Sequence, residues 1–192
     1  MLMTIRCTVT SHGTCAMPSF IDGRICIGDI NHWMTSNRLK LNTDKTDFIL
    51  LGTRQQLGKT SLKEIDINGV RVPVSTTVTC LGVLIDSELM FAAHMRRLTG
   101  RCFYQLRQLR SIRRTLTTEA AKTLAHALVI TRVDYCNSIF GLTSAVRLCP
   151  LQSVVNAAAR LIVKRRKYDH ITDSLRDDLH WLPIHYRCYY KL

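Results

Sequence analysis

The chain has 192 residues and a formal net charge of +13, from 27 Lys and Arg against 14 Asp and Glu. This length allows one domain of ordinary size or two small ones, and a hydrophobic fraction of 46% excludes a wholly disordered chain. The charge is uneven, because residues 1–90 carry nine basic and eight acidic side chains whereas residues 91–192 carry eighteen and six. The second half is therefore the candidate surface for a polyanion such as nucleic acid.

The cysteines and the N-terminal residues indicate where the protein works. Eight cysteines are scattered without a CxxC pair, several of them inside apolar patterns, which favours small buried side chains over a disulfide framework. Polar residues interrupt the N-terminal segment before any signal-peptide core forms, and no stretch approaches about 18 apolar residues. We therefore expect an intracellular protein, nuclear or cytoplasmic, with no membrane partner.

The pattern of the first ninety residues predicts a helix packed on a small antiparallel sheet. Apolar residues show no helical or strand spacing before Pro18, so residues 1–24 are assigned no function. Residues 22–37 follow a helical period. One apolar face of that helix is predicted to hold Cys26, Ile27, Ile30, Trp33 and Met34.

Short strands and turns are predicted after this helix. Residues 48–51 have the length of a strand, and residues 53–63 predict a polar loop. Residues 65–70 predict a hairpin around Asn68-Gly69, where a positive φ costs little. Residues 78–85 predict one further strand, and Gly82 inside it indicates close approach of another backbone or of a ligand.

The second half is predicted to be almost wholly helical. Its first helix carries an apolar face at steps of three, four and seven residues, namely Phe91, Met95, Leu98, Cys102, Leu106 and Leu109. A second helix is predicted from Thr118, as its N-cap, to about Tyr135. A third is predicted from Pro150, in its first turn, into the cluster Lys164–Lys167, and a further helical stretch follows Pro183.

Two basic clusters stand out in this half. Arg96, Arg107, Arg110 and Arg114 share one face of the first predicted helix, and no Asp or Glu lies between residues 96 and 114. Solvated helix faces usually alternate charges, so this stripe favours contact with a phosphate backbone. The second cluster is Lys164, Arg165, Arg166 and Lys167. It has three open interpretations, because cations are favoured at helix C-termini and are also typical of nuclear targeting and of phosphate contact.

The sequence contains no convincing metal site. Asp177-Asp178 is the one adjacent carboxylate pair, but it lies in a polar helix-like segment rather than in the apolar turn that polymerases use for Mg²⁺. His180, His185 and Cys188 match no closed zinc pattern. We predict that this chain holds no metal.

Five ordered blocks resemble a known family. The first is Ile30 to Thr46, and it resembles the segment after the catalytic turn in reverse transcriptases of non-LTR (LINE-type) retrotransposons. The others are Leu81-Gly82-Val83 with Asp86, residues 133–137, residues 151–161, and residues 170–183 with its His-Trp-Leu-Pro string. Together they cover residues 25–192.

The resemblance implies a role for several residues. Residues 25–88 would be a palm remnant and residues 89–192 a truncated thumb-like and post-thumb region. Lys45 would be the palm lysine near the incoming nucleotide, Leu81 and Gly82 would belong to the primer grip, and the arginine stripe would lie along an RNA/DNA duplex. The family uses Mg²⁺ held by Asp residues of two blocks that this sequence lacks, so we expect no catalysis by this chain alone.

These observations lead to one fold class and two function classes. The fold is expected to be α+β, a partial palm followed by a mainly helical region. The function is expected to be that of a polymerase fragment that binds a template–primer duplex without being an enzyme by itself. The alternative is a basic helical module for nucleic-acid binding or protein interaction, or a relic without selected function. The sequence leaves the oligomeric state open.

Overall fold

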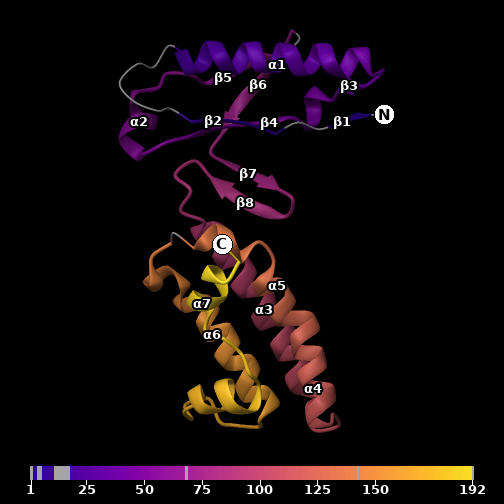
Figure 1. The fold of residues 1–192 in the computed structure, drawn as a ribbon, viewed down its shortest axis with the longest axis vertical. Helices are drawn as coiled ribbons and strands as arrows, with labels where there is room; N and C mark the ends of the chain where they lie inside the picture. Colours follow the sequence, from indigo (N-terminus) through magenta and orange to yellow (C-terminus); the bar gives the residue numbers. More distant parts are fainter. Residues whose placement is uncertain (1, 4–5, 11–17, 68, 142, 192) are drawn as a thin grey trace. The chain divides into compact units, whose positions relative to one another are not determined.

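The computed structural model describes residues 2–3, 6–10, 18–67, 69–141 and 143–191, and it describes side chains from residue 27 onward. The chain forms two compact units, residues 1–90 and residues 91–192 (Figure 1). The first combines helices with strands and the second is helical, so the α+β class is confirmed. Within the part of the chain that the structure describes, no helix has both the length and the apolar content needed to cross a bilayer.

The described residues of the first unit form two helices, one single-turn helix and eight short strands. In chain order these are β1 (Leu2–Met3), β2 (Arg6–Thr10), α1 (Pro18–Ser36), β3 (Lys40–Leu41), η1 (Thr43–Lys45), β4 (Asp47–Leu51), α2 (Arg54–Lys59), β5 (Glu64–Ile67), β6 (Val70–Ser75), β7 (Thr77–Cys80) and β8 (Val83–Asp86). The helix predicted over residues 22–37 is thus confirmed, although it begins four residues earlier.

The main sheet is mixed, so the prediction of a small antiparallel sheet is wrong. Its strand order is β2-β4-β6-β5, with β2 and β6 parallel to the central strand β4 and β5 antiparallel to β6. The strand predicted at residues 48–51 is this central strand. β2 lies in the segment that was left unassigned, because five residues are too few for a period to be recognised.

α1 packs on this sheet through a narrower face than predicted. Ile27 and Met34 are buried against Phe48, Ile65 and Ile67 of the sheet. The same core also contains Leu41 and Val72. Trp33, which was predicted on the buried face, is 56% exposed. Cys26 lies outside the residues whose side chains are described.

The segment predicted as a polar loop contains helix α2. Thr53 precedes it as N-cap, and its hydroxyl accepts from the backbone N–H of Gln56 at 3.4 Å. The Gln56 side chain accepts from the Thr53 backbone N–H at 2.9 Å, which completes a capping box. The Thr-x-x-Gln spacing was therefore a local helix signal.

Two hairpins follow, of which one was predicted. β5 and β6 pair as expected, with Ile67 opposite Val70 and with Gly69 at φ +81°. The strand predicted at residues 78–85 is instead the second hairpin, β7 and β8. Leu81 and Gly82 form its turn, both at positive φ, and a Cβ added at Gly82 would meet nothing within 4 Å. Gly82 thus lies in a turn rather than inside a strand, and the first alternative, close approach of another backbone, is wrong. The second alternative, close approach of a ligand, stays a prediction.

The second unit is built from α3 (Ala92–Ile112), α4 (Thr118–Ala125), the π-helical turn η2 (His126–Ile130), α5 (Thr131–Asp134), η3 (Asn137–Phe140), α6 (Ala145–Ile162), the π-helical turn η4 (Ser174–Asp178) and α7 (Ile184–Tyr189). The predicted apolar face of α3 is confirmed, since all of its members are buried except the half-buried Leu98. The helices predicted from Thr118 and after Pro183 are confirmed too, but the N-cap is Thr117, whose hydroxyl accepts from Ala120 N–H.

α6 differs from its prediction at both ends. It begins at Ala145, so Pro150 lies inside the helix rather than in its first turn. The carbonyl that proline leaves without its helical partner belongs to Val146, which is 79% exposed, so water can satisfy it. The helix ends at Ile162, so the basic cluster 164–167 lies in the loop that follows.

The cysteines follow their prediction in part. Among the described residues, Cys102 and Cys188 are buried, Cys80 and Cys136 are half-buried, and all are free thiols. Burial raises the pKa of the Cys102 thiol to about 11. Cys149 is exposed on α6, contrary to the expectation of buried cysteines.

Candidate functional site

The second unit contains a pocket of about 560 Å³ where the C-terminal ends of α3 and α6 meet. Eight of its nine lining residues are Lys or Arg, and the ninth is Leu161. We call this the basic pocket. Its basic residues are Arg110, Arg113, Arg114, Arg160, Lys164, Arg165, Arg166 and Lys167. The fold thus joins the end of the predicted arginine stripe to the second predicted basic cluster, residues 164–167.

Arg113 holds the two helix ends together. Its side chain is 7% exposed, and it donates from Nε to the Leu161 carbonyl at 2.9 Å and from Nη2 to the Ile162 carbonyl at 2.7 Å. A third bond runs from Nη1 to the Leu116 carbonyl at 2.8 Å. The last carbonyls of a helix lack helical partners, so this buried cation satisfies two of them on α6.

The loop after α6 is shaped by its own hydrogen bonds. Lys164 adopts the left-handed conformation with φ +56°, and the next residue, Arg165, donates its N–H to the Arg160 carbonyl at 3.0 Å. This is the usual ending of a helix, in which Gly is preferred at the left-handed position. Arg160 donates from Nε and Nη2 to the Asp169 carbonyl, both at 3.1 Å. The loop therefore folds back and presents residues 164–167 at one end of the unit.

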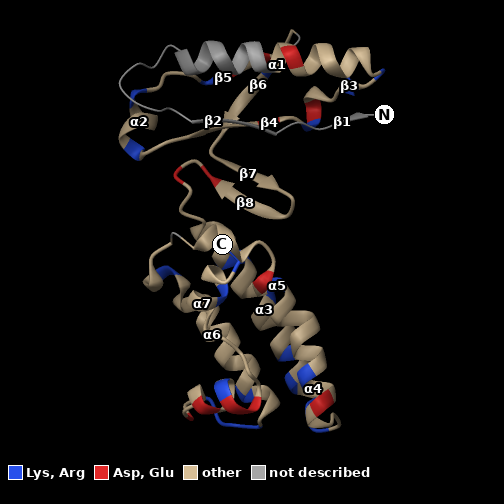
Figure 2. Ribbon diagram, in the orientation of Figure 1, with Lys and Arg blue, Asp and Glu red and all other residues tan. Residues whose placement is uncertain are grey.

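Acidic residues near the pocket offset only part of its charge. Residues 110–119 and 160–178 carry nine basic and five acidic side chains, a net charge of +4 (Figure 2). The C-termini of two helices contribute about −0.5 elementary charge each, which leaves an excess of about +3. Two of the carboxylates, Asp173 and Asp177, pair with Arg176, and its hydrogen bond lowers the pKa of Asp177. Helix dipoles alone thus do not account for this concentration of cations.

The other stripe residues lie on α3 outside the pocket. Arg96 and Arg107 are exposed, as are Arg110 and Arg114. From Arg96 to Arg110 the helix rises about 21 Å, and Arg114 lies in the turn just after its end. The Arg107 guanidinium lies 5.9 Å from the centre of the Tyr104 ring, which is itself half exposed. The stripe therefore presents cations along the length of a helix and ends at the pocket.

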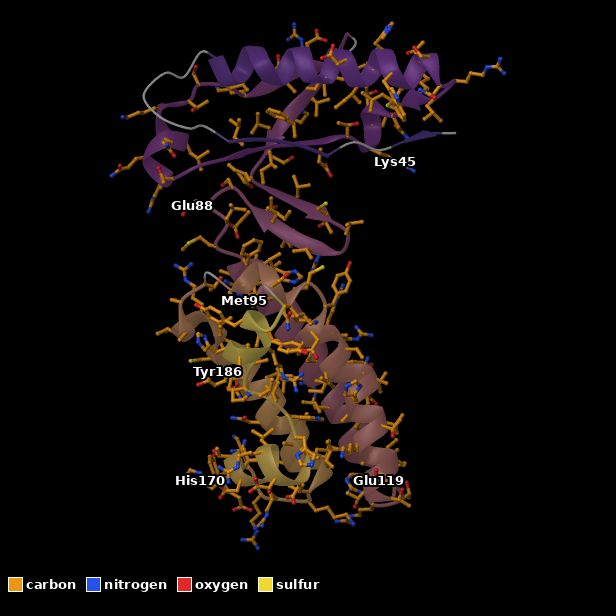
Figure 3. All side chains as sticks on the ribbon, viewed as in Figure 1. Lys45, Glu88, Met95, Glu119, His170 and Tyr186 are labelled. Atoms are coloured by element: carbon orange, nitrogen blue, oxygen red, sulfur yellow. The ribbon has the colours of Figure 1, made fainter. Side chains whose placement is uncertain are left out.

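The remaining predicted site residues belong to the first unit and do not line the pocket. Lys45 ends the single-turn helix η1 and is exposed, and Figure 3 labels it. Leu81, at the tip of the β7–β8 hairpin, is 79% exposed. Gly82 shares that tip.

Sequence reasoning missed Arg113 and Arg160 as pocket residues. Arg113 follows Leu109 by four residues and Leu106 by seven, so it continues the buried face of α3, and this spacing was the available signal. Arg160 was recognised as part of a resembling block but not as a cation near the cluster. Its role depends on the loop returning to residue 169, which no local pattern specifies.

The described residues contain no group of three or more His, Cys, Asp or Glu that could hold a metal ion. Asp177 and Asp178 lie in η4, and the Asp177 carboxylate accepts from Arg176 Nε at 2.7 Å. No protein-family model, curated protein or solved structure matches the chain.

Proposed function

We propose that the second unit binds nucleic acid through its phosphate backbone, and that the chain is a fragment related to the reverse transcriptases of non-LTR retrotransposons. The observation that supports the first part is the arginine stripe, whose four exposed cations follow α3 and end at the basic pocket. The second part relies on the five sequence blocks. The proposal assigns duplex binding to the chain and leaves polymerisation to the complete enzymes of that family.

The stripe and the pocket suit a polyanion of extended shape. Phosphates of one DNA strand follow each other at about 3.4 Å along the helix axis, so the rise of about 21 Å from Arg96 to Arg110 spans several of them. Contacts of this kind carry no base information and release counterions when they form. We therefore infer salt-dependent binding with little sequence preference.

The test is a titration of an RNA/DNA duplex with 5′-hydroxyl ends at several salt concentrations. The dissociation constant should rise steeply with salt. Changing Arg107 and Arg110 to Ala should reduce the slope of log K against log salt by the amount that corresponds to about two phosphate contacts. The matched control changes Arg101 and Arg132, which are exposed but lie outside the stripe and the pocket. It removes the same charge and should leave the slope nearly unchanged.

Binding that is absent or indifferent to salt would contradict the proposal. It would favour the other class of function, a protein-interaction module whose charge contributes to solubility. Equal flattening by both pairs of substitutions would also contradict it, because net charge rather than a located surface would then control binding.

A further inference from the structure

We propose that the basic pocket binds a ligand with several contiguous phosphates, such as the 5′-triphosphate end of an RNA, while the stripe contacts the side of the duplex. The inference rests on the proposed function in taking phosphate as the ligand of this unit. It adds that terminal, contiguous phosphates enter the pocket, whereas backbone phosphodiesters contact the stripe.

The size of the pocket favours a small group. A volume of about 560 Å³ lies in the range of sites for small ligands, whereas a duplex is too wide to enter it. A duplex side can approach the exposed stripe but reaches only the rim of the pocket. A chain end is thin enough to pass inside.

The charge of the pocket favours contiguous phosphates over a single phosphodiester. Each phosphodiester carries one negative charge, whereas a terminal phosphate carries up to about two, so a triphosphate end concentrates about four. This matches the excess of about +3 that remains after nearby carboxylates and helix ends are counted. No acidic side chain lines the pocket to oppose it.

Two arginines of the pocket are already held in place. A guanidinium has five N–H groups, and Arg113 uses three of them on carbonyls while Arg160 uses two. Two and three N–H groups respectively remain for a ligand. Because these side chains are fixed by the fold, little conformational entropy is lost when they bind phosphate oxygens. The exposed Arg166 and Lys167 can then close on the ligand from the loop.

The experiment compares two RNAs of one sequence that differ in their 5′ ends, triphosphate or hydroxyl, binding to the full chain. The triphosphate RNA should bind at least about tenfold more tightly, a difference of about 1.4 kcal/mol. Inorganic tripolyphosphate should compete with it, which shows that the phosphates alone are recognised. Failure of tripolyphosphate to compete would overturn the phosphate chemistry proposed for the pocket.

Variants locate the preference. Changing Arg166 and Lys167 to Gln should bring the ratio of the two affinities close to one, whereas changing Arg101 and Arg132 to Gln should preserve it. Equal binding of both RNAs, together with salt-dependent duplex binding, would overturn this inference and leave the proposed function standing. Loss of the ratio in both variants would also overturn it. Tight tripolyphosphate binding without any duplex binding would instead overturn the proposed function and support the pocket.

Discussion

At the scale of the residue, Lys164 combines a conformational cost with a useful charge. It occupies the left-handed position after α6, where a side chain costs about 1 kcal/mol relative to Gly, and it lines the basic pocket. If residue 164 served only the conformation of the loop, Gly at this position would be at least as stable as Lys. Stability and binding should therefore respond in opposite directions to changes at this position.

Changing Lys164 to Gly should raise the free energy of unfolding by about 0.5–1 kcal/mol and weaken binding of the 5′-triphosphate RNA. Urea denaturation and a titration with the 5′-triphosphate RNA measure the two effects. Lys164→Gln is the matched control, because it removes the charge but keeps the strain, so it should weaken binding without stabilising the protein. A Gly variant that is less stable than the original would contradict this account of the loop.

His94 makes the stability of the second unit depend on pH. It is buried beside Phe140, with ring centroids 5.9 Å apart. Burial lowers its pKa below the ordinary value of 6.5, with further lowering by the charges of Arg97 and Arg101. Between pH 6.5 and the lower folded-state pKa, the unfolded chain binds more protons at this residue than the folded chain does. Stability from His94 is therefore present above pH 6.5 and is lost as the pH falls.

The corresponding measurement is urea denaturation at about pH 7 and about pH 5.5. The free energy of unfolding should decrease toward the lower pH, and His94→Gln should decrease it less. Identical pH dependence in the two proteins would show that His94 is not the titrating group. His185, which is exposed on α7, offers the control substitution.

At the scale of the element, Arg113 joins α3 to α6 and its substitution tests that joint. Arg113→Ala leaves three carbonyl oxygens without their donor, so the free energy of unfolding should fall by about 2–4 kcal/mol. The neighbouring Arg114 is exposed, and Arg114→Ala should change it by less than about 0.5 kcal/mol. Chemical denaturation of both variants measures the difference. Equal effects would contradict a structural role for Arg113.

The sequence predicted best those elements in which apolar residues recur at a regular spacing over many residues. α3 was found because six apolar positions recur on one face over nineteen residues. α6 was started too late because proline is usually confined to a first turn, although here the freed carbonyl belongs to an exposed residue. β7 and β8 were predicted as one strand because the turn between them begins with Leu81. An apolar residue at that position makes the run look continuous, although the chain reverses at Leu81-Gly82.

The candidate site was predictable in its parts but not as a whole. Arg110, Arg114 and the cluster 164–167 were recognised from charge alone. Their convergence depends on the packing of α3 against α6, about fifty residues later in the chain, which local periodicity does not specify. Arg113 was not recognised from charge, because its role is to pair with backbone carbonyls of another helix.

At the scale of the whole molecule, the excess charge belongs to one unit. Residues 91–192 carry a net charge of +12 and residues 1–90 a net charge of +1. A field of one sign concentrates polyanions near a surface and raises association rates, but it does not by itself locate a site. Net charge therefore does not identify the binding surface. We expect the arginine stripe to be the surface that contacts phosphate.

The most direct test is nuclear magnetic resonance of the arginine side-chain Nε–H signals while a duplex with 5′-hydroxyl ends is added. Arg101 lies on α3 but away from the stripe, so it provides an internal control on the same helix. The account predicts that the signals of Arg107, Arg110 and Arg114 shift as the duplex binds, while that of Arg101 does not. Equal shifts at Arg101, or bound duplex without any shift along the stripe, would contradict it.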